Sequence, residues 1–329
     1  MAALPDRYAG SPMPGSLIDL RDLQPEHLAP LLDQEIEAWK SGLDWDFRAS
    51  ADLVKRFVQV RALNGFALVE GGVGVAQVAG YGYYVVEEGK GLIGDFFVRP
   101  SSRTAGSEYR LLEAVLEGMW RTPGIRRVEA QLMMLESYDA RAVPFSRWFR
   151  RFPRQFMETP LRGLALSPSP PSGALISPWA GHYNEEAARL IAASYRGHID
   201  SQINDQYRSP QGALRFLVNI VQYPGCGMFF APASFAARDR RTGELCGISL
   251  ASLIASDVGH ITQICVTPPH QRSKLGYELM RRSMEALQAH RCRSVTLTVT
   301  TDNEVARSLY ERMGFRNKRD FAAYVWDMA

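Results

Sequence analysis

The chain has 329 residues, enough for about two domains that each bury a core of their own. With 46% hydrophobic and 22% charged residues, its composition excludes a wholly disordered protein. A net charge of +3 is too small to indicate a nucleic acid or an anionic membrane as partner.

Neither cysteine chemistry nor membrane insertion is predicted. The four cysteines, at positions 226, 246, 265 and 292, show no CxxC or Cys/His spacing, so we expect neither structural zinc nor a disulfide framework. The N-terminal segment lacks the apolar run of a signal peptide, and no apolar stretch of 18 residues occurs. We therefore expect a cytoplasmic protein.

An internal repeat organises the chain. Residues 97–112 (FVRPSSRTAGSEYRLL) align with residues 265–280 (CVTPPHQRSKLGYELM) at a constant offset of 168. The matched positions are Val98 with Val266, Pro100 with Pro268, Arg103 with Gln271, and Leu111 with Leu279. After the next helix the register slips by one residue, and Val128, Ala130 and Leu132 match Val295, Leu297 and Val299. Residues 166–173 (LSPSPPSG) form a linker that does not favour helix or strand. We predict domains at 1–165 and 176–329, separated by a linker at 166–175.

The second copy predicts a mixed α/β domain. In chain order, the expected elements are helices at 185–195 and 212–221, strands at 228–238, 245–256 and 260–268, a helix at 274–290, a strand at 294–300, a short helix ending at Gly314, and a strand at 321–328. A run of antiparallel strands followed by strand–helix units indicates a central, mostly antiparallel sheet flanked by helices.

The segment 264–280 has the pattern of an anion site. A strand leads directly into a tight loop that opens a helix, so several backbone N–H groups converge on one point. Gly276, near the helix entry, would let a phosphate approach the backbone. A pyrophosphate would suit this arrangement.

Two blocks together resemble the GNAT N-acetyltransferases. Residues 296–315 (TLTVTTDNEVARSLYERMGF), with Asn303 and Tyr310, are similar to the last conserved block of that family. The loop Gln271-Arg272-Ser273-Lys274-Leu275-Gly276 resembles its acyl-CoA signature, Gln/Arg-x-x-Gly-x-Gly/Ala. The resemblance covers residues 176–329 well and 18–160 faintly. It implies two tandem GNAT folds, with the working site in the C-terminal copy.

The resemblance also implies a reaction: an acetyl group passes from acetyl-CoA to a primary amine of a small molecule, by direct attack in a ternary complex without metal or covalent intermediate. In that family the strand before the loop diverges from its neighbour, and its free backbone groups hold the pantetheine arm and the thioester carbonyl. Here these groups belong to Ile264, Cys265 and Val266, followed by the phosphate-binding loop 271–276. A backbone N–H there would stabilise the oxyanion. Asn303 would contact CoA, cap its helix, or do both.

Two residues are candidates for the proton transfers. Tyr310 matches the family's acid for the departing thiolate, although it could instead anchor its helix on the sheet. His260, eleven residues before Gln271, stands where some members carry a glutamate base. Asp257, Glu244 and a water chain are rival bases. Cys265 is predicted to be a small core residue rather than a nucleophile.

Both copies depart from the family pattern. Lys274 replaces the first glycine of the signature, which is acceptable if the position does not require positive φ; its ammonium would then pair with a phosphate or remain in solvent. In the first copy Glu108 stands opposite Gly276, and three further positions have lost their chemistry: Leu92, Glu136 and Val143 stand opposite His260, Asn303 and Tyr310. We expect that copy to be non-catalytic and to buttress the active copy or close one wall of the acceptor cleft.

In the family that the chain resembles, the region between the first two helices lines the acceptor pocket, so the resemblance implies that the acceptor contacts of the second copy lie there. The candidates there are Tyr195, His198, Asp200, Asp205 and Tyr207, with an ordinary polar loop as the alternative. Residues 145–154 (FSRWFRRFPR) suit a packed helix-to-strand corner better than a single-stranded nucleic acid. We expect a small-molecule amine as partner, no nucleic acid or membrane, and a monomer or homodimer. A pseudoenzyme that binds acyl-CoA or a partner without turnover, and transfer of a longer acyl or an aminoacyl group, are the alternatives.

Overall fold

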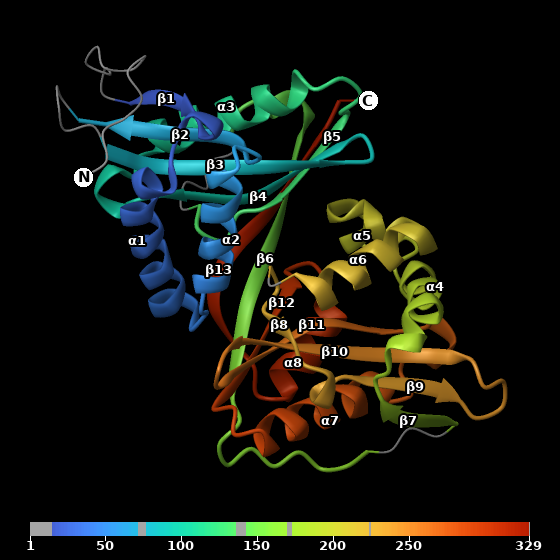
Figure 1. Ribbon diagram of the computed structural model, residues 1–329. Helices are drawn as coiled ribbons and strands as arrows, with labels where there is room; N and C mark the ends of the chain where they lie inside the picture. Colours follow the sequence, from blue (N-terminus) through green and yellow to red (C-terminus); the bar gives the residue numbers. More distant parts are fainter. Residues whose placement is uncertain (1–14, 72–76, 136–142, 170–172, 224, 329) are drawn as a thin grey trace. The chain divides into compact units, whose positions relative to one another are not determined.

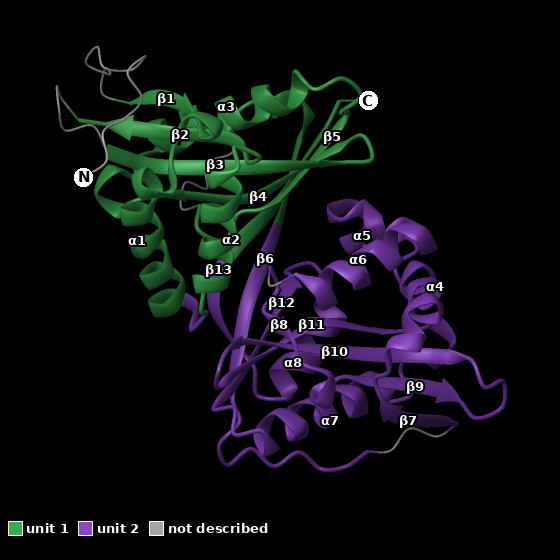
Figure 2. Cartoon of the chain, viewed as in Figure 1, with its two compact units in different colours: residues 1–42, 46–152, 321–329 green, residues 43–45, 153–320 purple. Residues whose placement is uncertain are grey.

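The computed structural model describes residues 15–71, 77–135, 143–169, 173–223 and 225–328. The chain forms two compact units: residues 1–42, 46–152 and 321–329 make unit 1, and residues 43–45 and 153–320 make unit 2 (Figure 2). The units are interleaved along the chain, and the boundary predicted at 166–175 remains a prediction about where the two sequence repeats meet. None of the described helices is long and apolar enough to cross a bilayer.

Unit 1 is a sheet with helices on both faces (Figure 1). Its strands, in the order β1-β2-β3-β4-β5-β13, are β1 (Ser16–Asp19), β2 (Asn64–Glu70), β3 (Gln77–Glu87), β4 (Lys90–Val98), β5 (Arg127–Gln131) and the C-terminal part of β13 (Arg316–Asp327). Its helices are α1 (Pro25–Leu43), α2 (Arg48–Gln59) and α3 (Ala105–Trp120). On β3, Tyr81 bonds to Glu35 of α1, while Gly82 faces Val115 of α3. Since successive strand residues point to opposite faces, α1 and α3 cover opposite sides.

The last strand of the chain completes the core of unit 1. β13 pairs antiparallel with β5, and its alternate residues Ala322, Tyr324 and Trp326 are buried among the side chains of α3 and β4. The Trp326 indole N–H donates to the Pro144 carbonyl at 2.9 Å. Val143 belongs to the same core, so the position opposite Tyr310 serves packing in this copy.

The aromatics of the segment 145–154 also pack in unit 1. The Phe145 ring lies edge-on to Trp120 with centroids 4.2 Å apart, and Phe149 stacks on Tyr324 at 5.4 Å. Arg150 bonds to the Asp327 carboxylate at 2.5 Å. The predicted packed corner is therefore present.

Unit 2 is also a sheet between helices. Its strands, in the order β6-β12-β11-β10-β9-β7, are β6 (Phe149–Pro160, which begins in unit 1), β12 (Ser294–Thr300), β11 (Val258–Val266), β10 (Leu245–Ala255), β9 (Phe235–Asp239) and β7 (Ala174–Pro178), with β8 (Met228–Phe229) paired to β10. Its helices are α4 (Asn184–Ser194), α5 (Asp200–Ile203), α6 (Pro210–Gln222), α7 (Leu275–Ala289) and α8 (Glu304–Arg312). The predicted elements are present, with one correction: the strand expected at 228–238 is broken by a 3-10 turn at Ala231–Ala233. Pro232 has no N–H to donate to a ladder.

Residues of β10 show which helices cover which face of unit 2. The Ser249 hydroxyl bonds to Ser283 of α7 at 2.8 Å, whereas Ile248 and Leu250 pack with α4 and α6. α7 therefore covers one face, and α4 and α6 cover the other.

The two copies share their fold down to the strand register. β4 pairs parallel with β5 from Lys90–Arg127 to Ile93–Ala130, and β11 pairs parallel with β12 from Val258–Ser294 to Ile261–Leu297. The antiparallel ladders on the other side skip one residue at Gly94 and at Thr262, which are equivalent positions in the repeat. A bulge thus recurs at the same place in both copies.

Candidate functional site

The two central strands of unit 2 diverge beyond Ile261. β12 continues to pair with β6 as far as Thr300, but β11 from Thr262 onward is paired only with β10. Divergence of this kind, which the resemblance implied, leaves a gap between β11 and β12.

The direction of the β11 backbone groups follows from the ladder with β10. The Thr267 N–H donates to the Cys246 carbonyl at 2.9 Å, and hydrogen-bonded and non-hydrogen-bonded pairs alternate in an antiparallel ladder. Cys265 therefore bonds to β10, while Ile264 and Val266 direct their backbone groups into the gap. Burial raises the pKa of the Cys265 thiol to about 12, so this side chain stays un-ionised in the core.

The loop after β11 leads into an uncapped helix. Arg272 and Lys274 have φ of 59° and 67°, and Lys274 is the N-cap of α7 without a side-chain cap. The first helical bond runs from the Glu278 N–H to the Lys274 carbonyl, so the N–H groups of the three preceding helical residues have no intrahelical acceptor. Left-handed residues before a helix entry direct such N–H groups into one concavity, which favours an anion.

Lys274 departs from the sequence expectation. A lysine suits this position only if the position does not require positive φ, but the φ of Lys274 is 67°. This conformation costs an L-residue about 1–2 kcal/mol. The backbone retains the shape that glycine normally supplies, at the cost of local strain beside the candidate site.

Gly276 fits a phosphate-binding role. A Cβ added there would lie 3.8 Å from Val266 and 3.9 Å from Leu309, so packing within the protein does not demand glycine. The N–H groups around the helix entry suit the pyrophosphate of CoA. The loop residues predicted to hold that group, Gln271 to Gly276, lie together here.

A histidine that the sequence analysis missed anchors this loop. His270 Nδ1 lies 3.0 Å from the Thr267 hydroxyl, and Nε2 lies 2.7 Å from an oxygen of Asp239. Hydrogen bonds lower the pKa of Asp239 to about 2: the Thr242 backbone N–H has the largest effect and the His270 side chain the second largest. The Gln271 amide donates to the Val266 carbonyl at 3.3 Å. The β9 turn thus holds the loop in place.

The equivalent helix of the first copy is closed by its own side chains. Thr104 Oγ1 accepts the Ser107 N–H at 3.0 Å, and Ser107 Oγ accepts the Thr104 N–H at 2.8 Å. Glu108 is buried at the first turn, 3.9 Å from Arg103. These groups occupy donors that a phosphate would use. Of the other lost positions, Leu92 is half-buried in β4, and Glu136 lies outside the described residues.

His260 does not fit the predicted base role. Its ring is 5% exposed, with Trp45 at 5.5 Å and Phe156 at 6.0 Å between centroids, and its Nδ1 lies 2.8 Å from the Thr296 hydroxyl. Burial lowers the pKa of His260 to about 3, and the nearby positive charge of Arg154 contributes a smaller part of this shift. A general base needs a pKa near the working pH and access to the amine, and His260 has neither.

The rival bases also stand away from the gap. Asp257 lies in the β10–β11 turn, at the opposite end of β11, and pairs with Arg293 at 3.0 Å. Glu244 is exposed in the turn before β10.

Tyr310 and Asn303 lie on α8. Tyr310 is buried, and burial, with smaller effects from Asp200 and Cys265, raises its pKa above the ordinary value of 10. It therefore holds its proton at neutral pH. Asn303 caps α8 through the Ala306 N–H at 3.2 Å, and its amide nitrogen lies 3.2 Å from His198 Nε2.

Four of the five acceptor candidates gather at the gap. The Gln263 amide donates to the Tyr195 hydroxyl at 2.9 Å and accepts from the Tyr207 hydroxyl at 3.4 Å, and the two tyrosine rings stack at 4.4 Å. Asp200 accepts the Thr300 hydroxyl, and His198 contacts Asn303. Asp205 lies in the next turn, Asp205–Arg208. Gln263, a polar residue within an apolar strand, was missed from the sequence.

Part of the chain is similar to the GNAT acetyltransferases. Residues 201–315 match the acetyltransferase (GNAT) family model, which spans the gap, the α7 loop and α8. Its general chemistry is acyl transfer, and acetyl-CoA is the cosubstrate of its acetyltransferases.

Individual proteins extend this likeness. A mycothiol acetyltransferase of Streptomyces avermitilis is 30% identical over 164 residues, which is 48% of this chain and 48% of the relative, so the match spans about half of either protein. A GCN5-related N-acetyltransferase from Sphaerobacter thermophilus superimposes with a TM-score of 0.64 at 16% identity. The superposition covers 99% of this chain and 97% of that protein. A tandem GNAT protein from the clavulanic acid biosynthesis pathway has a TM-score of 0.61 at 16% identity, with 95% and 98% covered. The fold is two tandem GNAT folds.

Proposed function

We propose that this chain transfers an acetyl group from acetyl-CoA to a primary amine of a small molecule, by direct attack in a ternary complex at unit 2. One observation carries the proposal: the unpaired half of β11 continues into the uncapped, glycine-containing start of α7. Backbone groups that could hold the pantetheine arm, on β11, are therefore followed in the chain by backbone N–H groups that could hold the pyrophosphate, at the start of α7. Bound acetyl-CoA would supply the activated thioester.

The backbone of the gap would hold and polarise the donor. The N–H groups at the start of α7 would bind the pyrophosphate, and the groups of Ile264 and Val266 would bind the pantetheine arm and the thioester carbonyl. An N–H aimed at that oxygen stabilises the negative charge that develops when the amine attacks, often the largest single contribution to catalysis.

Proton transfer is assigned to His198 and Tyr310. His198 replaces His260 as the proposed base because its side chain is 31% exposed and lies beside a carboxylate. Its Nδ1 accepts the Asp200 backbone N–H at 3.1 Å, and an Asp200 carboxylate oxygen lies 3.7 Å away. His198 would take the proton lost by the attacking amine, and the Asp200 carboxylate would stabilise the imidazolium. Tyr310, kept protonated by burial, would give its proton to the departing thiolate. Asn303 would position His198.

The nature of the acyl group is inferred from the partial relative. That protein is a mycothiol acetyltransferase, which supports acetyl over a longer chain.

The test is the release of CoA thiol from acetyl-CoA in the presence of a panel of small primary amines. We expect amine-dependent release, lowered about 10²–10⁴-fold by Tyr310→Phe with an unchanged Kd for acetyl-CoA. Tyr223→Phe, at a tyrosine that is 57% exposed, is the matched control and should not change the rate. Binding of acetyl-CoA without release for any amine would refute transfer and support the pseudoenzyme alternative.

A further inference from the structure

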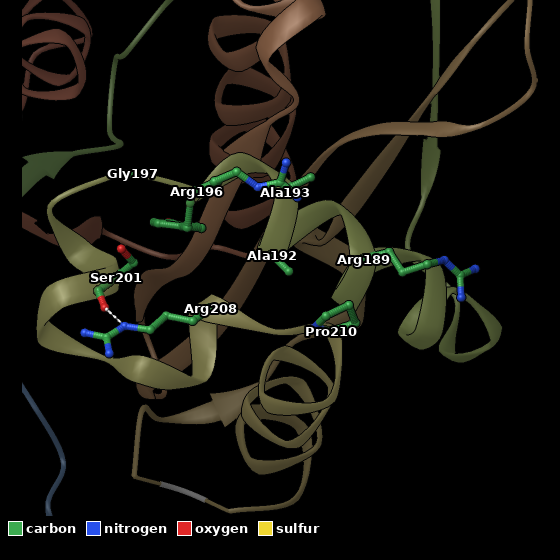
Figure 3. A pocket seen from close by; sticks show the side chains of 9 residues that line it. Arg189, Ala192, Ala193, Arg196, Gly197, Ser201, Arg208 and Pro210 are labelled. Atoms are coloured by element: carbon green, nitrogen blue, oxygen red, sulfur yellow. Dashed lines mark hydrogen bonds between the residues drawn. The ribbon is translucent and has the colours of Figure 1, made fainter. Parts of the chain in front are cut away.

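A cationic cleft lies on the α4 side of unit 2. It has a volume of about 290 Å³ and lies between the C-terminal half of α4 and the segment that leads to α6 (Figure 3). Three arginines, Arg189, Arg196 and Arg208, stand around it. In Figure 3 the side chains of Arg189 and Arg208 extend in opposite directions, so their guanidinium groups lie at the two outer sides of the cleft.

The spacing along α4 builds one wall of the cleft. Arg189, Ala192, Ala193 and Arg196 follow the i, i+3, i+4, i+7 pattern of one helix face. The two alanines leave room between the arginines. Arg196 follows the end of α4, where a cation also suits the helix dipole, but this does not account for Arg189 within the helix.

Arg208 lies on the other wall of the cleft, where a hydrogen bond holds its side chain. Its Nε donates to the Ser201 carbonyl at 2.8 Å, so the bond fixes the side chain through Nε rather than through the terminal nitrogens. The planar guanidinium suits a carboxylate or a phosphate.

Two nearby carboxylates are bonded elsewhere. Glu186, on α4, pairs with Arg238 through two bonds of 2.9 and 3.0 Å. Asp200 accepts the Thr300 hydroxyl. Glu186 also interacts electrostatically with Arg189. Among the described residues no carboxylate pairs with Arg196 or Arg208, so these two charges are available to an external anion.

Tyr195 connects this cleft to the gap. It lines the cleft, and its hydroxyl accepts the Gln263 amide of β11. The cleft and β11 are therefore separated by about the length of a tyrosine side chain.

We infer that the amine acceptor carries an anionic group, a carboxylate or a phosphate, which binds Arg196 and Arg208 at the cleft while the amine enters the gap. This inference rests on the proposed function. It favours acceptors whose amine and anion lie several bonds apart, and it disfavours α-amino acids, in which the two groups are adjacent.

The kinetic test compares amines in matched pairs. Glucosamine 6-phosphate is set against glucosamine, and 6-aminohexanoate against its amide, so that the two pairs separate phosphate from carboxylate. We expect at least one anionic amine to exceed its neutral counterpart about tenfold in kcat/KM. Arg196→Gln and Arg208→Gln should each reduce this preference about tenfold through KM, because each removes a charge-assisted contact. Arg241→Gln, at an exposed arginine of the β9–β10 turn, is the control and should retain it.

Two outcomes overturn the inference. If neutral and anionic amines react equally, or if the preference survives both cleft substitutions, the cleft does not select the acceptor, although acetyl transfer itself stands. If no amine reacts, the proposed function fails, and a binding measurement tests whether the cleft takes an anion. Calorimetric titration of glucosamine 6-phosphate and of 6-aminohexanoate into the full chain should then show saturable binding of at least one probe. The double variant that combines Arg196→Gln with Arg208→Gln should weaken this binding. No binding, or equal binding by the double variant, refutes the cleft.

Discussion

His260 offers a quantitative test of the environment that removes it from the base role. In the folded chain its pKa is about 3, whereas an unfolded histidine titrates near 6.5. Below pH 6.5 the unfolded state binds a proton that the folded state does not, so stability falls as the pH falls, until the folded pKa is reached. Each pH unit contributes about 1.4 kcal/mol, which gives about 3 kcal/mol between pH 6.5 and 4.5.

The perturbation is His260→Asn, which retains a polar atom near Thr296 but cannot take the proton. Urea unfolding, followed by tryptophan fluorescence at half-unit pH steps, measures both proteins. The variant should be the less stable at pH 7, because it loses ring contacts with Trp45 and Phe156. Its deficit should shrink by about 3 kcal/mol by pH 4.5. A stability difference that stays constant over this range would refute the buried, neutral histidine. The variant should also keep the acidic limb of the kcat/KM profile.

Three further substitutions test separate parts of the account. Lys274→Gly should raise the free energy of unfolding by about 1 kcal/mol in urea titrations, because glycine tolerates the positive φ, and should retain acetyl-CoA affinity; a loss of affinity would place the ammonium on a phosphate. His270→Ala should weaken acetyl-CoA binding about tenfold in calorimetry with unit 2 still folded by circular dichroism, since it frees the loop from Asp239; unchanged binding would make this anchor irrelevant. Trp326→Ala should destabilise unit 1 by about 3–5 kcal/mol and expose residues 46–152 to proteolysis first; earlier cleavage within 174–315 would contradict the place of the last strand in the core of unit 1.

The sequence predicts what depends on local pattern. The helices and strands of residues 176–329, the strand–loop–helix around Gly276 and the repeat all follow from periodicity, turn residues and spacing. The single strand expected at 228–238 was wrong because Pro232, visible in the sequence, interrupts the ladder.

Non-local packing accounts for what the sequence did not predict. His260 is buried because Trp45, from the distant α1–α2 corner, covers its ring, and no local spacing encodes that contact. β13 follows α8 in the chain but joins β5, and strand pairing across such a separation leaves no periodic signal. The φ of Lys274 is hidden because a lysine does not reveal the left-handed conformation that a glycine would have indicated.

The central claim is that acetyl-CoA binds at the start of α7 in the second copy and not at α3 in the first. Calorimetric titration of acetyl-CoA into the full chain, Gly276→Glu and Gly106→Glu tests it most directly. Gly106 is an exposed glycine at the start of α3, where a Cβ would come no closer than 3.8 Å to a neighbour, so its variant is a matched control. We predict one saturable site that is abolished by Gly276→Glu and unchanged by Gly106→Glu. Binding that is indifferent to Gly276, or that is lost with Gly106→Glu, would contradict the account.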